Sequence, residues 1–241
     1  MKQLRWLVPL VAALAFLAAQ GSAAFAAPPD ETPSAHPVKC NINFVFPEAR
    51  LSTSGNGPRY VHSSYRVMED CRLVEVEHVE LKELPRGAGS QQSDEPMSVL
   101  AAPAGVNGHT ADLFTYELDV LGIKTNGLRT TQAWTWMGGT VSLSNWSNLS
   151  YLCCGWWYKW APESFSNGYD NPSHTQGWAN GNVTNYCNGA AFCPGSGPQD
   201  VITWHNWLHL YSSGGASMTG TSSEGTIIPG GSLDYDFVIR D

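Results

Sequence analysis

The sequence predicts an all-β fold: an antiparallel β-sandwich, with a barrel as the less favoured alternative, carrying a long disulfide-pinned loop. Beyond the first 26 residues, no stretch of the 241-residue chain shows a long apolar stripe with the 3.6-residue period of a helix. Alternation of apolar and polar residues recurs instead, between turn signals rich in Gly, Asn, Ser and Pro. Val, Thr, Tyr and Trp, which favour pleated strands, are frequent in these alternating stretches.

The N-terminal segment, residues 1–26, has the pattern of a secretory signal peptide. Lys2 and Arg5 form a positive start, an apolar run covers residues 6–19, and Ala-Phe-Ala at 24–26 fits a cleavage site. The apolar run has 14 residues, which is shorter than the roughly 20 that a membrane-spanning helix needs. We therefore expect a secreted, extracellular protein, and the style of the signal is bacterial.

The exported part is predicted to hold one folded domain. Residues 27–37, APPDETPSAHP, read as a disordered leader, and residues 38–241 as a single β-rich domain. A Gly-, Pro- and Ser-rich loop at 85–108 is too long for an ordinary turn, so it is also a possible domain boundary.

The charge balance excludes two classes of partner. The chain has a formal net charge of −8, and removal of Lys2 and Arg5 leaves 11 basic residues against 21 acidic ones. Binding to nucleic acid or to an anionic membrane needs clustered Lys and Arg, which this chain lacks. We expect no nucleic-acid partner, no membrane insertion and no cofactor, and the sequence does not predict an oligomeric state.

All cysteines lie in the exported part and are even in number, which predicts disulfides. Excluding a strained bond between the neighbours Cys153 and Cys154 leaves 12 of the 15 possible pairings. The most local arrangement joins Cys40 to Cys71 and bonds each of Cys153 and Cys154 to one of Cys187 and Cys193. A zinc site is not favoured, because the chain has no CxxC pair and no Cys/His cluster at ligand spacing. The six cysteines are Cys40, Cys71, Cys153, Cys154, Cys187 and Cys193.

Two stretches show the strand alternation most clearly. In LDYDFVIR, one face carries Leu233, Tyr235, Phe237 and Ile239, and the other carries Asp234, Asp236 and Arg240. In LFTYELDV, Phe114 and Tyr116 share a face opposite Thr115. The other predicted strands are 41–46, 59–67, 71–83, 128–137, 140–146, 151–160, 201–212 and 216–222.

The stretch YLCCGWWYKW, residues 151–160, is predicted as one strand whose two neighbouring cysteines point to opposite faces. Each would then need its own distant partner, so that bridges to Cys187 and Cys193 would pin the segment 161–200 against this strand. The even-numbered face reads as core, and the face with Trp157 can pack or bind.

The stretch 201–211, VITWHNWLHLY, has an apolar face that is broken only by Asn206. The opposite face can be a second packed surface with polar tips hydrogen-bonded, or a strip that binds sugars by stacking on aromatic rings. A shared metal is disfavoured, because residues four apart on a strand lie roughly 13 Å from each other. This opposite face carries Thr203, His205, Trp207, His209 and Tyr211.

The segment 161–200 is low in charge and rich in Asn, Gly, Ser and aromatic residues, so it is predicted as loop. This composition resembles that of binding loops, although a disulfide-held structural loop would look the same. The positions of interest are Tyr169, Asp170, His174, Trp178, Asn180 and Asn182.

We expect a non-catalytic protein that binds an extracellular carbohydrate or another cell-envelope ligand on an aromatic sheet face. One alternative is a secreted hydrolase that combines His205 or His209 with Glu163, Asp170, Asp200 or Glu224. The other is a protein-binding inhibitor or adhesin module that uses the 161–200 segment. No nucleophile motif such as GxSxG supports catalysis. The predicted ligand-binding residues are Trp157, Tyr169, His174, Trp178, His205, Trp207, His209 and Tyr211.

Overall fold

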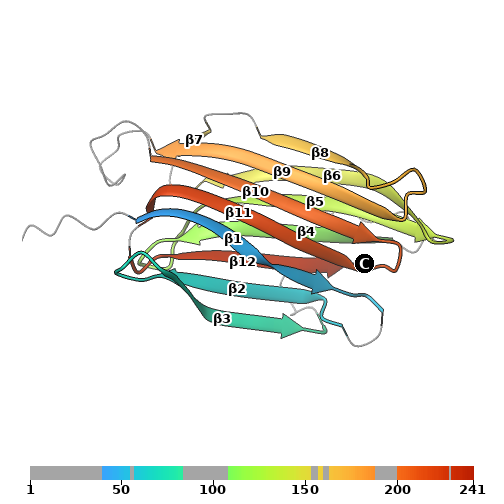
Figure 1. Cartoon of the computed structure of the whole chain (residues 1–241), viewed down its shortest axis with the longest axis horizontal. Coiled ribbons are helices and arrows are strands. Elements are labelled where there is room, and N and C mark those ends of the chain that lie inside the picture. Colours follow the sequence, from blue (N-terminus) through green and yellow to red (C-terminus); the bar gives the residue numbers. More distant parts are fainter. Residues whose placement is uncertain are drawn as a thin grey trace, which may run out of the picture. The chain divides into compact units, whose positions relative to one another are not determined.

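The strands of the protein form two antiparallel sheets, described here from a computed structural model (Figure 1). No helix among the described residues is long and apolar enough to cross a membrane. The structure describes residues 40–54, 57–83, 108–152, 157–159, 163–187, 200–227 and 229–241.

Sheet A has the strand order β1-β11-β10-β9-β7, and β8 also pairs with β9. Sheet B has the order β3-β2-β12-β4-β5-β6. Sheet A contains β1 (Cys40–Leu51), β7 (Trp157–Lys159), β8 (Ser164–Tyr169), β9 (Gln176–Cys187), β10 (Asp200–Tyr211) and β11 (Ala216–Ile227). Sheet B contains β2 (Tyr60–Val67), β3 (Leu73–Leu81), β4 (Gly108–Leu118), β5 (Lys124–Met137), β6 (Thr140–Leu152) and β12 (Ser232–Arg240).

The sandwich prediction is confirmed: the two sheets share one hydrophobic core and do not close into a barrel. Aromatic rings from both sheets meet at its centre. The ring of Phe46 in sheet A lies 6.4 Å from that of Trp204 and packs edge-on against Tyr235 of sheet B at 5.7 Å. The predicted alternation of β12 is confirmed, because Leu233, Tyr235 and the following odd-numbered residues are buried in this core.

A buried amide connects the two sheets. Asn206 of β10 is fully buried, and its Nδ2 donates to the backbone carbonyls of Leu113 (3.3 Å) and Leu128 (2.9 Å) in sheet B. The Thr115 hydroxyl donates to Asn206 Oδ1 at 2.8 Å. The polar residue that interrupts the apolar face of 201–211 is therefore a cross-sheet connector with satisfied hydrogen bonds.

A second polar chain runs between the sheets through Trp204, Asn126 and Glu117. The Trp204 indole N–H donates to Asn126 Oδ1 at 2.5 Å, and Asn126 Nδ2 donates to the Glu117 carboxylate. The Thr125 hydroxyl donates to the same carboxylate oxygen at 2.8 Å. Burial raises the pKa of Glu117 to about 7, although these hydrogen bonds oppose the shift.

The predicted bond between Cys40 and Cys71 is present, with a Cα–Cα distance of 5.3 Å. It joins the start of β1 in sheet A to the turn between β2 and β3 in sheet B. Closing this span of 31 residues stabilises the fold by about 3–4 kcal/mol in the chain-entropy description. Residues 153, 154 and 193 lie outside the described part, as does the side chain of Cys187, so the other two pairings stay predictions.

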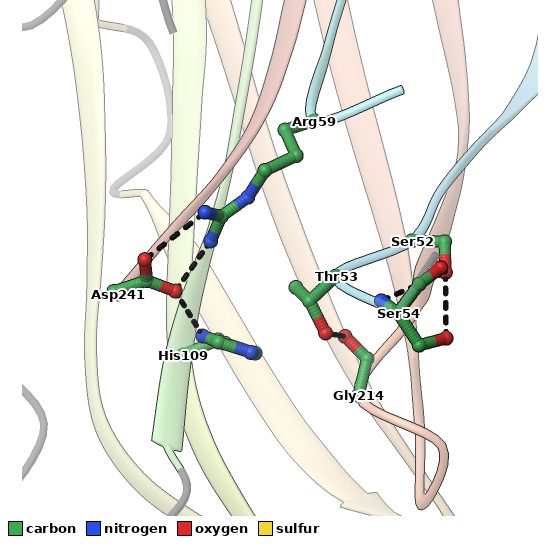
Figure 2. Close-up of polar contacts among 7 residues, drawn as sticks. All are labelled: Ser52, Thr53, Ser54, Arg59, His109, Gly214 and Asp241. Carbon is green, nitrogen blue, oxygen red and sulfur yellow. Dashed lines mark hydrogen bonds and ion pairs between the residues drawn. The ribbon is translucent and has the colours of Figure 1, made fainter. Parts of the chain in front are cut away.

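Polar contacts also fasten the chain near one end of the strands (Figure 2). The Asp241 carboxylate, just after β12, forms an ion pair with Arg59 before β2. His109 Nδ1 at the start of β4 lies 2.9 Å from Asp241 Oδ1. The Thr53 hydroxyl donates to the Gly214 carbonyl at 3.1 Å, which links the segment after β1 to the β10–β11 turn.

Two predicted elements are wrong. Residues 151–160 are not one strand, because 151–152 end β6 in sheet B whereas β7 at 157–159 pairs with β9 in sheet A. The chain therefore changes sheets within this stretch. The segment 161–200 is not a continuous loop either, since it contains β8 and β9. Their glycines and small residues, which favoured a loop prediction, lie inside a sheet.

The Gly-, Pro- and Ser-rich segment lies outside the described residues up to position 107. The strands that flank it, β3 and β4, belong to the same sheet, where β2 and β12 lie between them. Residues 37–241 form one compact unit. The signal peptide and leader, residues 1–37, fall outside the described part and stay predictions.

We predict that Asn206→Ala lowers the free energy of unfolding by about 2–4 kcal/mol, because three hydrogen bonds are lost and the Thr115 hydroxyl loses a buried acceptor. Urea denaturation measures the change. The control is Asn182→Ala on the exposed side of β9, where we expect a change within about 0.5 kcal/mol. Equal effects of the two variants would contradict a special role for Asn206.

The raised pKa of Glu117 predicts a loss of stability as the pH rises from about 4.5 to 7. Over this range the unfolded chain releases the proton while the folded chain retains it, so ionisation favours the unfolded state. Glu117→Gln keeps an acceptor for Thr125 and Asn126 and removes the charge. Relative to wild type it should gain about 1–2 kcal/mol between pH 4 and pH 8. Parallel stability curves of the two proteins over that range would exclude the effect.

Candidate functional site

The outer side of sheet A carries the predicted row of rings. Residues 200–211 form strand β10, in which Ile202, Trp204, Asn206 and the next two even-numbered residues are buried. The odd-numbered side chains from Thr203 to Tyr211 are half-buried rather than sealed. The predicted alternation is confirmed. We use the name aromatic face for Trp178 of β9 together with His205, Trp207, His209 and Tyr211 of β10.

Two indoles form the centre of the aromatic face. The rings of Trp178 and Trp207 are 5.5 Å apart and nearly parallel, with 14° between their planes. Such an offset stack covers one face of each ring, and both indoles remain partly exposed. Gly168 of β8 lies directly opposite Trp178, and a Cβ at this glycine would come within 2.8 Å of the indole. The missing side chain thus makes room for the ring.

Two imidazoles flank the central indole. The rings of His205 and His209 lie 5.9 Å and 6.0 Å from that of Trp207. Gln176 Nε2 donates to His209 Nδ1 at 3.0 Å, so the neutral ring carries its proton on Nε2 and can donate there. Burial lowers the pKa of His205, which favours its uncharged form at neutral pH.

The strands that form and border the aromatic face carry mainly polar, uncharged side chains. On either side of β10, His205 lies between Asn182 and Thr221, and Trp207 lies between Asn180 and Thr219. The described side chains of β8, β9, β10 and β11 include no Asp, Glu, Lys or Arg. Hydroxyl and amide groups therefore border Trp207 and His205, whereas the paired charges of Glu48 and Arg50 on β1 interact with His209 and Tyr211.

The outer side of sheet B is different, because it carries charges that pair with one another. Asp236 Oδ1 accepts a hydrogen bond from the Tyr60 hydroxyl at 2.6 Å and lies 3.0 Å from His62 Nδ1. Asp112 accepts from Arg129 Nε at 2.8 Å and pairs with Arg240 at 3.2 Å. These ionic groups already have partners within the sheet.

Three predicted ligand residues are not placed on the aromatic face. Tyr169 of β8 points toward sheet B, since its hydroxyl accepts a hydrogen bond from the Leu143 backbone N–H at 3.0 Å. Its ring stacks on His174 at 3.9 Å, so these two residues form a separate pair near the β8–β9 turn. The side chain of Trp157 lies outside the described residues. Trp178, His205, Trp207, His209 and Tyr211 do come together.

The acids of the hydrolase alternative are not paired with the imidazoles where the structure describes them. Glu163 accepts from the Ser150 backbone N–H at 2.7 Å, and Asp170 is exposed. In the described part of the chain, neither His205 nor His209 forms an ion pair or a hydrogen bond with a carboxylate. The side chains of Asp200 and Glu224 lie outside it. No cluster of described His, Cys, Asp or Glu residues could hold a metal ion.

Sequence reasoning named Trp178, Asn180 and Asn182 but placed them in a loop, and it missed that they lie on strand β9 beside β10. Gln176, Trp178, Asn180 and Asn182 share the outer side, whereas the residues between them are buried Gly, Ala and Val. That alternation of small inward and polar outward residues was a usable strand signal. Glu48 of β1 was missed as well: a hydrogen bond from Arg50 lowers its pKa, and Ser217 and His209 add to the shift.

Comparison with known proteins gives no relative, since no family model, curated protein or solved structure matches this chain.

We predict that Gly168→Val displaces the Trp178 indole, because a side chain at this position would overlap the ring. In a ¹⁵N–¹H spectrum, the indole N–H signals of Trp178 and Trp207 should shift, while that of Trp146 stays in place. The control is Ser166→Val, two residues earlier on the same side of β8 and opposite Asn180. Shifts of equal size in both variants would show that Gly168 has no special role in seating the ring.

Proposed function

We propose that the protein is a secreted, non-catalytic binding protein and that its aromatic face binds an uncharged carbohydrate. The observation that supports this most directly is the chemistry of the face. A stacked pair of indoles is surrounded by hydroxyl, amide and imidazole groups, and no carboxylate or Lys/Arg cation lies among the described side chains of β8 to β11.

Stacking on the indoles would supply the apolar part of the interaction. The C–H groups on one face of a sugar ring pack well against the electron-rich face of an indole. Both indoles of the stacked Trp178–Trp207 pair are only half-buried, so part of their ring surface is left for such contacts.

Polar groups at the border would supply orientation. Binding sites commonly combine apolar and aromatic surface with a few placed donors and acceptors. Here Asn180 and Thr219 flank Trp207, and Asn182 and Thr221 flank His205. Both amides and hydroxyls donate and accept, as sugar hydroxyls require. An uncharged ligand also avoids the penalty of desolvating an ion over strands β8 to β11, whose described side chains include no Asp, Glu, Lys or Arg.

We predict that the protein lacking residues 1–26 binds at least one insoluble polysaccharide among cellulose, chitin and peptidoglycan in a pull-down assay. Trp207→Ala removes the central ring and should weaken binding at least about ten-fold, as truncation of a central aromatic contact does. The dissociation constant follows from depletion of protein from solution over a series of polysaccharide concentrations.

The matched control is Trp146→Ala. Trp146 is 52 % exposed and stacks on Phe165 at 4.0 Å, away from the aromatic face. This variant should bind like wild type. Absence of binding to all three polysaccharides, or equal loss in the two Trp variants, would refute the proposal.

A further inference from the structure

A pocket of about 510 Å³ lies at the edge of the sandwich, and two residues that line it, Glu48 and Arg50, interact electrostatically with His209 and Tyr211 of the aromatic face. This volume falls within the roughly 300–1,000 Å³ of small-molecule sites. Its walls come from β1 of sheet A and from β3 of sheet B, and each of these strands is the last in its sheet. The side chains that matter below are Glu48, Tyr65, Glu75, His78, Glu80 and Tyr235.

A β-bulge shapes the wall that β1 contributes. The register between β1 and β11 shifts between Phe46 and Ala49, so that Pro47 and Glu48 form the irregular part of the strand. Bulges of this kind redirect side chains at sheet edges and beside functional sites. Both Pro47 and Glu48 line the pocket.

The pocket also has buried tyrosines and an ordered imidazole. Tyr65 and Tyr235 are only 6 % and 2 % exposed. The Ser63 hydroxyl donates to the Tyr235 hydroxyl at 3.3 Å, and His78 Nδ1 lies 2.7 Å from Ser63 Oγ. Because Ser63 uses its single proton on Tyr235, His78 Nδ1–H is the donor to Ser63.

This Ser–His–Glu row does not make a hydrolase. Ser63 is fully buried, so its oxygen cannot reach a substrate carbonyl in the pocket. His78 Nε2 lies 3.3 Å from Glu80 Oε1, and Nδ1 is 3.4 Å from Glu75 Oε1. The row instead holds His78 in place between two carboxylates.

The pocket has an excess of negative charge. Glu48 pairs with Arg50 at 2.9 Å, which balances one acidic side chain. Glu75 accepts a hydrogen bond from the Tyr65 hydroxyl at 3.2 Å, a neutral partner. In the described part of the chain, neither Glu75 nor Glu80 forms an ion pair with Lys or Arg. Their carboxylates are about half exposed and so remain open to a cationic ligand.

The surroundings favour an organic cation over a metal ion. Calcium needs six to eight oxygen ligands, and no described group of His, Cys, Asp or Glu could hold a metal. An alkylammonium group can pair with the carboxylates while its methylene groups lie against the tyrosine rings. We propose that this pocket binds a primary alkylammonium group, in contact with Glu75, Glu80 and the ring of Tyr65.

The test compares n-butylamine, which is protonated at pH 7, with its uncharged analogue n-butanol. Titration followed by ¹⁵N–¹H spectra should shift backbone signals around Glu75 and Glu80 with the amine and leave them in place with the alcohol. Equal shifts with both compounds, or none with the amine, would overturn the proposal. The signals that report the result belong to Glu75 and Glu80 on β3 of sheet B, whereas carbohydrate binding is measured through Trp207 of sheet A, so the two proposals can fail separately.

Charge-removing variants test which carboxylates are involved. Glu75→Gln and Glu80→Gln should each raise the dissociation constant of n-butylamine about two- to five-fold, the range expected for a partly exposed ion pair. Glu77→Gln is the matched control, because Glu77 is on β3 but does not line the pocket. An equal effect of Glu77→Gln would show a general influence of net charge and would refute a specific site.

Two further probes separate the possible sources of the ammonium group. Nα-acetyl-lysine N-methylamide represents a lysine of a partner protein, and 1,4-diaminobutane represents a free polyamine. Tighter binding of the lysine derivative assigns the pocket to a protein partner, and tighter binding of the diamine assigns it to a small metabolite. Failure of both to shift the Glu75 and Glu80 signals would overturn the proposal.

Discussion

The hydrogen bonds of Asn206 with sheet B decide which side of β10 faces outward. Successive residues of a strand point to opposite sides, so a shift of one position would bury His205 or Trp207 and expose Asn206. The buried amide bonds to two carbonyls and one hydroxyl of sheet B, which makes such a shift costly. The exposed row of rings therefore follows from a contact on the opposite side of the same strand.

The neighbouring strand β9 also packs against sheet B, and it does so with small inward residues. A Cβ at Gly181 would lie 2.2 Å from the side-chain oxygens of both Thr130 and Asn148, and one at Gly177 would lie 2.7 Å from Leu143. β9 can therefore approach sheet B only where it has no inward side chain at these positions. Its larger side chains, among them Trp178 and Asn180, are left for the outer side. The small inward residues of β9 therefore explain both the close contact between the sheets and the large side chains on the outer surface.

The size of the buried side chains explains which strands could be predicted from the sequence. β10 and β12 were predicted because large apolar residues alternate with polar ones, and the Cys40–Cys71 bond because its cysteines are local. β9 was missed because its buried side consists of Gly, Ala, Val and Asn, and small residues with Asn resemble loop composition. In β4, Phe114 and Tyr116 do share a side, but Lys124 lies over their rings while Thr115 faces the core. The hydrogen bond from Thr115 to Asn206 across the sheets accounts for the burial of this polar residue, and the composition of the strand does not predict such a bond.

The distribution of charge gives the surfaces of the protein different ligand preferences. Asp236 and Asp112 on the outer side of sheet B are paired within the sheet, whereas the described side chains of β9 and β10 include no Asp, Glu, Lys or Arg. The excess of acidic residues still sets a negative potential around the molecule, which falls off within about 10 Å at 0.1 M salt. Polyanions are thus disfavoured on every surface. Neutral ligands meet no opposing charge on the aromatic face, and cations are drawn to the carboxylates between β1 and β3.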